Sequence, residues 1–510
     1  MVLNERFGFS FYFGVLILLA FSLQIVTIFF NQYFWDDQTV INAPFRSLSE
    51  QFDYTGRPYL KYFYMFFKGE SQILILRGLS WLFYNIGIYF LYNIIKFYFI
   101  NTRVSKFVVL FVLIFPYFLA KLNVINIYYV LGFTLFLASY YYYIYEKSHL
   151  ILILILQFVS YFLLNSLVFL IPTIVILHLF NKPIKRFKPL FSEVLIFSVN
   201  LLFILIRFLY FKSDGIYNHY NEVSIDSISH SYLFFFKSII YTMYSFFNLI
   251  VDSLTSSNYF VFLFFLFCIY FYFFVKKYIL SEFKKLNFSI KWIFIQAIIL
   301  FYFSSLAYNI AGQLIGFTFT VSRNQNILVV SYILFFLGVL FLLKKTTDIF
   351  FVSFISILMS TFVVASAFNI KEVFKSNMIQ DSLEYNFVND PVFVKYNNFI
   401  IDDNIESIIW KNSKRFYVYS NLYYKVSNRK ENKCFLNAIE YNHLIENSNR
   451  YTLEMYKMRF INPKSKFLRI KLRSNFELND DGYVFQNMFY YFFDRVLYNR
   501  NVSSIVSVIV

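Results

Sequence analysis

The sequence predicts an all-α bundle of about eleven membrane-spanning helices, followed by a small α/β domain in the carboxyl-terminal part. Three observations lead to this fold class. The 510-residue chain is 59% hydrophobic and only 15% charged, with a mean hydropathy of +0.56. Long apolar runs recur until residue 368, and the basic residues gather in the short loops between them. Beyond that residue the composition becomes more polar, and no run is long enough to cross a bilayer.

Composition also limits the classes of partner and site. With 74 Phe and 45 Tyr, aromatic residues are too common to mark a site, so an aromatic stripe is interpreted as packing or lipid-facing. A net charge of +17 would suit nucleic acid, but here the loop cations set membrane orientation, so no nucleic-acid partner is predicted. The two cysteines, Cys268 and Cys434, have no metal-ligand spacing, and the sequence has no Gly-rich phosphate loop.

Residues 7–30 form the first predicted span. This run is too long for a signal-peptide core and no convincing cleavage site follows it, so it is predicted to stay uncleaved. The polar outer loop 31–71 comes next, and its residues 45–52 have the amphipathic pattern of a short helix along the membrane surface. Gly56 and Pro58 break that helix in a turn, which holds Arg57 in a defined place.

The remaining spans follow from the apolar runs and from the basic loops. Residues 232–251 are apolar enough to span, but the basic segment 276–291 would then lie outside, against the orientation rule. We therefore predict that residues 232–251 lie at the interface or re-enter, with the amino terminus inside and the carboxyl terminus outside. The further predicted spans are 72–95, 107–120, 124–145, 149–164, 166–180, 190–211, 259–275, 292–312, 326–343 and 349–368. Arg77, near the start of the span 72–95, is predicted to reach outward to the interface, and Lys121-Leu122-Asn123 to form a short outer turn.

Residues 369–510 are predicted to form an extracytoplasmic domain, separate from a membrane module of residues 1–368. A tail of ~140 residues is long enough for a small domain of its own. It also has too many large apolar residues for a disordered tail. Residues 415–419 and 467–472 are strand-like, and a helix is predicted to begin within 402–411.

The most informative stretch is Phe34-Trp35-Asp36-Asp37-Gln38, which directly follows the first span. Two adjacent carboxylates are costly close to lipid and add nothing to membrane insertion, so they need a reason. In one interpretation Asp36 and Asp37 form a polar stop that caps the next helix, with Trp35 as an interfacial anchor. In the other, one of them is a catalytic base or a metal ligand that faces a lipid-borne substrate.

The predicted topology places this acidic pair on the same outer face as several cations. Arg57 and Lys61 lie in the first outer loop, and Arg323 lies in the late outer segment Ser322-Arg323-Asn324-Gln325. Guanidinium groups suit a phosphate or pyrophosphate at the depth of the lipid headgroups. From charge and sidedness we predict Arg57, Arg323 and Lys61 as substrate phosphate ligands. The structural alternative for each is ordinary interfacial anchoring.

This layout resembles the GT-C class of integral membrane glycosyltransferases, and within it the bacterial enzymes related to O-antigen-modifying glucosyltransferases. The resemblance covers the order of the parts: a first span, an acidic loop, a juxtamembrane helix, many further spans and an outward carboxyl-terminal domain. The segments that carry it are Trp35-Asp36-Asp37, Thr55-Gly56-Arg57-Pro58 and Ser322-Arg323-Asn324-Gln325. The acidic loop is the most specific of the three.

The resemblance implies a hexosyltransferase of the bacterial cytoplasmic membrane. Such enzymes move a sugar from a polyprenyl-phosphate-linked donor to a glycan or lipid-linked acceptor on the outer face of the membrane. An outer-loop Asp typically serves as base toward the acceptor hydroxyl, and this role is carried over to Asp36 and Asp37 only. Some members use a divalent cation such as Mg²⁺ or Mn²⁺, for which the same two carboxylates are the candidate ligands.

Two other classes of membrane protein also handle polyprenyl-linked glycans. An O-antigen polymerase or ligase would place its functional arginines in large outer loops between spans, whereas here the largest outer segments are the first loop and the tail. A transporter or flippase should show internal repeats and charged residues buried in mid-span. The sequence shows neither feature clearly, because most ionisable residues lie at predicted span ends.

Overall fold

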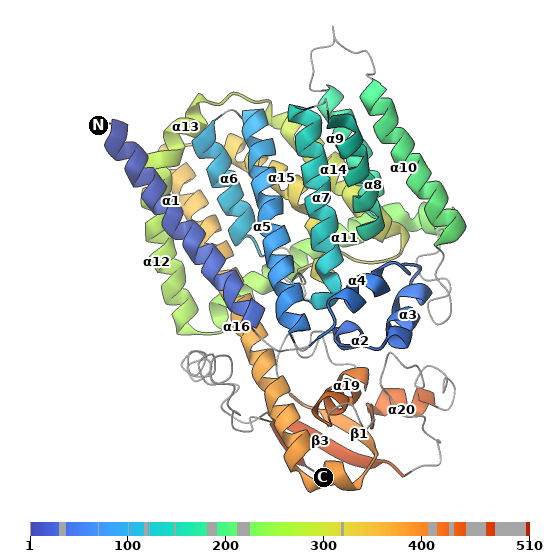
Figure 1. The fold of residues 1–510 in the computed structure, drawn as a ribbon. Coiled ribbons are helices and arrows are strands. Elements are labelled where there is room, and N and C mark those ends of the chain that lie inside the picture. Colours follow the sequence, from blue (N-terminus) through green and yellow to red (C-terminus); the bar gives the residue numbers. More distant parts are fainter. Residues whose placement is uncertain are drawn as a thin grey trace.

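The computed structural model describes residues 2–29, 37–69, 71–99, 101–116, 121, 123–146, 149–180, 191–211, 225–317, 321–405, 416–427, 433–444, 466–474 and 506–509. Within these residues the chain is mostly helical, and a small sheet lies in its carboxyl-terminal part, as predicted. Figure 1 shows the helices gathered in one bundle, with the sheet beyond one end of it.

The longer helices make up this bundle. They are α1 (Val2–Ile25), α5 (Gln72–Phe99), α6 (Thr102–Ile114), α7 (Ile127–Tyr145), α8 (Leu150–Leu163), α9 (Leu167–Phe180), α10 (Phe191–Tyr210), α11 (Ile225–Thr255), α12 (Asn258–Phe274), α14 (Ile290–Ile310), α15 (Val329–Leu343) and α16 (Asp348–Asn389). Short elements connect them: the helical turns η1 (Val26–Phe29), η3 (Val124–Asn126), η7 (Val275–Ile279) and η8 (Val321–Leu328), and the helices α2 (Asp37–Val40), α3 (Phe45–Tyr54), α4 (Leu60–Phe66) and α13 (Leu280–Lys285).

Seven helices of the described chain are long and apolar enough to cross a membrane. They are Gln72–Phe99, Val124–Tyr145, Ile228–Thr255, Asn258–Lys285, Ile290–Ile310, Asn324–Leu343 and Asp348–Asn389. These helices fit a multi-pass membrane protein, but the predicted number of about eleven spans is not confirmed. Part of the difference is length, because α6, α8 and α9 have 13, 14 and 14 residues. At 1.5 Å per residue such helices cover only ~20 Å of a hydrocarbon core that is ~30 Å thick.

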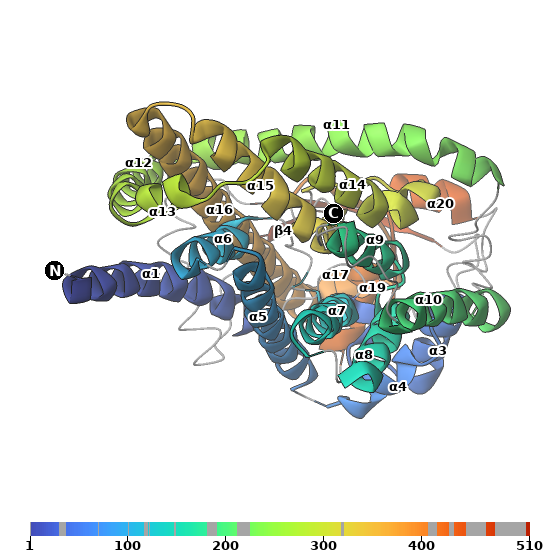
Figure 2. The ribbon, with the colours of Figure 1, turned by 90° about the horizontal axis from the view of Figure 1, so that it is seen from above.

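Helix α11 contains the predicted interfacial stretch 232–251 as one continuous helix. Its length and composition are sufficient for a span, yet it runs across the bundle: Figure 2 shows it from the side, whereas α7 is seen almost end on. The hydroxyls on α11 bind the chain that follows α14. Thr242 donates to the carbonyl of Ile315 at 2.8 Å, and the Ser245 hydroxyl accepts from the backbone N–H of Phe317 at 3.0 Å.

Helix α16 joins the bundle to the carboxyl-terminal part without a break. It has 42 residues and continues well past the boundary at 368/369 that composition suggested. Its last turns pack on the sheet region, where the backbone N–H of Val506 donates to the Ser382 hydroxyl at 2.8 Å. An ion pair of 2.6 Å between Lys425 and Glu384 adds a second connection. The carboxyl-terminal part is therefore fastened to a bundle helix rather than linked by a loop.

The sheet has the strand order β2-β1-β3-β4, with β1 (Asn398–Asp403), β2 (Cys434–Leu436), β3 (Leu468–Ser474) and β4 (Val506–Ile509). β1 pairs in parallel with both β2 and β3, and β4 is antiparallel to β3. The short helices α17 (Pro391–Lys395), α19 (Phe416–Val426) and α20 (Ala438–Leu444) accompany it, which gives the predicted α/β character. β3 confirms the strand predicted at 467–472.

One local prediction in this part was wrong, and a second falls mostly outside the described residues. The stretch predicted as a strand at 415–419 is helical from residue 416 onward, because it begins α19. All of its residues from 418 to 423 are buried, so burial shows no period there, and five residues read alone cannot distinguish a helix from a strand. The helix predicted to begin within 402–411 does not start at 402, which belongs to β1, and residues 406–411 lie outside the described chain.

Candidate functional site

The predicted site residues lie at the end of the bundle that faces the carboxyl-terminal sheet. Figure 1 shows α2, α3 and α4 together at this end, and α19 contacts α2. Asp37 opens α2, whereas Asp36 lies outside the described residues. Arg57 lies in the turn between α3 and α4, and Lys61 lies in the first turn of α4. Arg323 belongs to η8, but its side chain is not among those that the structure describes.

Asp37 is fully buried and both of its carboxylate oxygens have partners. Oδ1 accepts the backbone N–H of Ile125 at 3.0 Å, and Oδ2 lies 3.8 Å from Nη2 of Arg77. Arg77 is only 3% exposed, so it points inward to Asp37 instead of reaching outward to the headgroups as its place near a span end suggested. A buried carboxylate needs such partners, and removing one of them leaves an uncompensated charge. Asp37 therefore joins α2 to α5 and η3.

Arg57 is held by the way in which α3 ends. Gly56 has a φ of +66°, and its N–H donates to the backbone carbonyl of Asp53. The N–H of Arg57 donates to the backbone carbonyl of Phe52 at 2.7 Å. This is a Schellman motif, which requires a residue such as Gly that tolerates the left-handed region. The motif projects the Arg57 side chain toward α7, where Nη1 donates to the Tyr128 hydroxyl at 2.8 Å.

Arg57 has a second cation beside it and no carboxylate. Arg207 of α10 donates to the carbonyl of Gly56, so the two guanidinium groups lie close enough to repel each other. Within the described chain neither Arg57 nor Arg207 forms an ion pair. Among the described residues Arg57 contacts uncharged phenol groups instead, with the Tyr128 ring centroid 5.2 Å from its guanidinium carbon. Two neighbouring cations without an acid are suited to an anionic ligand.

The predicted segments meet at one short stretch, residues 123–129, which we call the central turn. Asp37 accepts from Ile125 and Arg57 donates to Tyr128. Asn326 of η8, the residue directly after the late outer segment, donates to the carbonyl of Tyr129 at 3.3 Å. The acidic loop, the Gly-Arg turn and the late outer segment are far apart in sequence. Their contacts with the central turn place all three at one end of the bundle.

Tyr64 of α4 closes the central turn from another side. Its hydroxyl lies 3.1 Å from the carbonyl of Val124 and 3.0 Å from that of Ile125, and it donates to them. Burial raises the pKa of Tyr64 well above its usual value, and nearby Tyr128 and Asp37 raise it further. The phenol therefore stays neutral, serves as a hydrogen-bond donor and fixes the turn.

The remaining predicted residues have other surroundings. Lys61 binds both carboxylate oxygens of Asp53 at 2.9 Å, so its charge is already matched within the first outer loop. Beside Arg323, the side chains of Ser322, Asn324 and Gln325 are buried, and Tyr332 donates to Oε1 of Gln325. Oδ1 of Asn324 and Nε2 of Gln325 are buried without a hydrogen-bond partner in the described structure.

The donor set around Asp37 does not fit a divalent cation. Its oxygens face a guanidinium and a backbone N–H, which repel a metal ion rather than share it. Across the described residues no three His, Cys, Asp or Glu side chains gather as a metal-binding group.

Sequence reasoning missed three cations of this region: Arg77, Arg207 and Lys121. Arg77 was interpreted as an interfacial residue, Arg207 as part of a span, and Lys121 as part of a short outer turn. Ionisable residues inside or beside apolar runs are expensive, and that cost is the signal that singles them out. Which of them would pair with an acid and which would not depends on the fold.

No protein-family model matches the chain, and comparisons with curated proteins and with solved structures found no match. Function is therefore inferred from the residues of the site.

Proposed function

We propose that the protein is a membrane glycosyltransferase that moves a hexose from a polyprenyl-phosphate-linked donor to a cell-envelope glycan or lipid acceptor. The reaction would take place at the outer face of a bacterial cytoplasmic membrane. The observation that carries the proposal is that Asp37 and Arg57 both contact the central turn, with Arg207 beside Arg57 and no acid paired with either arginine in the described chain. A transferase that uses a lipid phosphate needs a base and a phosphate site at one depth.

In this mechanism the acceptor hydroxyl oxygen attacks the anomeric carbon of the donor. The bond between that carbon and the phosphate oxygen breaks, and the polyprenyl phosphate leaves with the electron pair. Arg57 and Arg207 stabilise the negative charge that grows on the leaving phosphate. A carboxylate of the acidic pair takes the proton of the acceptor hydroxyl. Because both oxygens of Asp37 are already engaged, we assign the proton to Asp36 and a positioning role to Asp37.

The test compares the two carboxylates in full-length protein reconstituted with lipid-linked donors. Asp36→Asn should lose transfer by ~10²-fold or more, the usual scale for removing a positioned base, while its thermal stability stays close to wild type. Asp37→Asn should lose stability as well as activity, because Arg77 then lacks its acid. Transfer near the wild-type rate in both variants would return the pair to a polar helix boundary. The lipid-linked glycan that changes on deletion of the gene identifies the substrates to supply.

A polymerase, ligase or flippase for polyprenyl-linked glycans is the alternative. The buried ion pair of Lys371 and Glu372, at 3.5 Å, is the kind of charge that a transport pathway uses. It lies just beyond the predicted span 349–368, however, and not at mid-span. Proteoliposomes discriminate between the two classes: a flippase moves the intact lipid-linked glycan to the other leaflet, whereas the proposed enzyme releases free polyprenyl phosphate.

The sidedness can be tested without substrate. A reporter that is active only outside the cytoplasm should be active when fused after Val510. An inactive reporter there, with an active one in the loop 181–190, would reverse the orientation of the whole site.

A further inference from the structure

Lys121 is a cation without an acid beside the central turn. It lies between α6 and η3, and its backbone carbonyl accepts from the Ser80 hydroxyl at 3.1 Å. Its half-buried side chain places Nζ 4.0 Å from the ring centroid of Tyr84. No carboxylate of the described chain lies within ion-pair distance of it, and Asp37 is already paired with Arg77. Lys121 thus has an aromatic face but no counter-charge.

A lysine in this position is unstable as a cation. Removal of the amine from water lowers the pKa of Lys121 to about 7, and no opposite charge offsets this effect. A cation–π contact of this kind does not replace an anion, because the ring offers only the partial negative charge of its face. Any anion that enters would hold the proton on the amine and gain a charge-assisted hydrogen bond.

A buried amide close to Lys121 along the chain also lacks partners. Asn123, two residues along the chain, is fully buried, and both atoms of its side-chain amide are without a hydrogen bond in the described structure. Buried polar groups are nearly always satisfied in folded proteins, so an amide with neither atom satisfied points to a ligand. The ammonium and the two amide N–H donors suit the oxygens of a phosphate, and the amide oxygen suits a P–OH or a neighbouring hydroxyl.

We propose that Lys121 and Asn123 bind a phosphate group, at a site separate from Arg57 and Arg207. The phosphate becomes the counter-ion that Lys121 lacks in the protein alone. As a substrate site it rests on the proposed function, since a second phosphate at the central turn means that the acceptor, like the donor, is a lipid phosphate. Binding of the anion itself depends only on Lys121 and Asn123, and not on the proposed function.

Acylation of the amine tests the site, because only the neutral amine reacts. Full-length protein in phosphatidylcholine nanodiscs is labelled at pH 7.5, and each lysine is quantified by mass spectrometry. One arm adds inorganic phosphate against a chloride control at equal ionic strength, and the other replaces part of the phosphatidylcholine with phosphatidic acid. Lys106 is the internal control, since it too is a half-buried lysine over aromatic rings, those of Phe9 and Phe13.

We expect labelling of Lys121 relative to Lys106 to fall by ~10-fold or more in at least one arm, because bound phosphate keeps the amine protonated. Protection by inorganic phosphate identifies a site open to free phosphate, and protection by phosphatidic acid alone identifies a lipid-headgroup site. Asn123→Ala should weaken the protection. Equal labelling in both arms and in the controls would overturn the proposal. Since the assay contains no sugar, its failure is distinct from a failure of the transferase function.

Discussion

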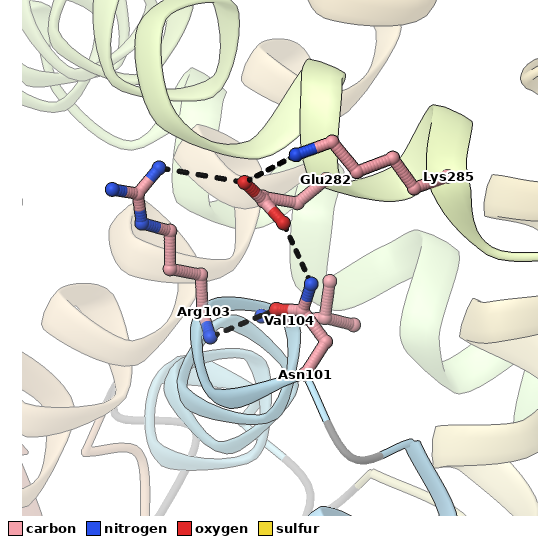
Figure 3. Close-up of polar contacts among 5 residues, drawn as sticks. All are labelled: Asn101, Arg103, Val104, Glu282 and Lys285. Atoms are coloured by element: carbon pink, nitrogen blue, oxygen red, sulfur yellow. Dashed lines mark hydrogen bonds and ion pairs between the residues drawn. The ribbon is translucent and has the colours of Figure 1, made fainter.

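Two charged clusters at opposite ends of the helical bundle are neutralised to different extents. At the end away from the sheet, Glu282 of α13 is surrounded by partners: Asn101 donates to it at 2.7 Å, Lys285 lies at 3.2 Å and Arg103 at 3.5 Å. Figure 3 shows these side chains converging on one carboxylate from α6 and α13. Asn101 also caps α6, since its side-chain oxygen accepts from the N–H groups of Arg103 and Val104.

At the central turn only one of four cations has an acid. Arg77 is paired with Asp37, whereas Arg57, Arg207 and Lys121 have no carboxylate in the described part of the chain. The Glu282 cluster is satisfied by the protein itself and fastens two helices. At the central turn only part of the charge is paired within the described protein. Selection for stability alone does not favour such partly paired charges. Natural sequences depart from local consistency mainly at functional sites, so this difference supports the proposed ligand sites near the central turn.

The largest expected effect is on the buried pair. Arg77→Met leaves Asp37 buried without its cation, and we expect a loss of roughly 3–5 kcal/mol of folding free energy. The matched change at the other end is Arg103→Met. The Arg103 side chain is 27% exposed, and its partner Glu282 keeps its contacts with Lys285 and Asn101. There we expect about 1 kcal/mol or less. Unfolding in mixed detergent measures both, and equal losses would mean that burial does not separate the two ends.

The next effect is on catalysis without a matching loss of stability. Arg57→Met removes a cation that has no acid to leave behind, so the fold should stay intact while use of the lipid-phosphate donor falls by about 10- to 100-fold. Arg57→Lys keeps the charge but loses the planar fork, and it should retain part of the activity. Transfer rates and thermal unfolding of the same preparations check both. Loss of stability in Arg57→Met with normal transfer would assign Arg57 to packing against Tyr128.

The sequence predicted the ends of elements better than it predicted partners. The amphipathic stretch 45–52 is helical in α3 and the turn at Gly56 has positive φ, because both follow from local chemistry. The strand at 415–419 was wrong because a window of five apolar and polar residues fits either period, and only the packing of α19 decides it.

Partners could not be predicted because they depend on contacts between distant segments. Lys61 and Arg57 look alike in sequence, as cations of one outer loop. In the structure Lys61 forms an ion pair with Asp53. Arg57 instead donates to the Tyr128 hydroxyl and lies beside a second arginine, Arg207. Arg77 was expected to reach outward, but the N–H of Ile125 and the Arg77 guanidinium share one buried carboxylate. The convergence of the three segments on one face was predicted. The central turn on which they meet was not, because no motif marks residues 123–129.

The smallest expected effect is a stability change that depends on pH. An unfolded lysine has a pKa of ~10.4, whereas folding lowers that of Lys121 to about 7. Between these values the unfolded chain holds a proton that the folded chain has lost, so this residue makes the wild-type protein more stable as pH rises through the window. Below pH 7 the folded state carries the full cost of the charged amine. Lys121→Met removes that cost and should therefore raise the melting temperature by a few degrees at pH 6, with a gain that shrinks as pH approaches 10.

The control and the ligand complete this test. Lys106→Met removes a half-buried lysine over aromatic rings at the opposite end, so the effect specific to Lys121 is the difference between the two variants at each pH. Phosphate should reverse the order at pH 6, because it stabilises wild type through Lys121 and leaves Lys121→Met unchanged. If the difference is flat from pH 6 to 10 and phosphate does not alter it, Lys121 is an ordinary solvated lysine. The contrast between the two ends would then rest on Arg57 and Arg207 alone.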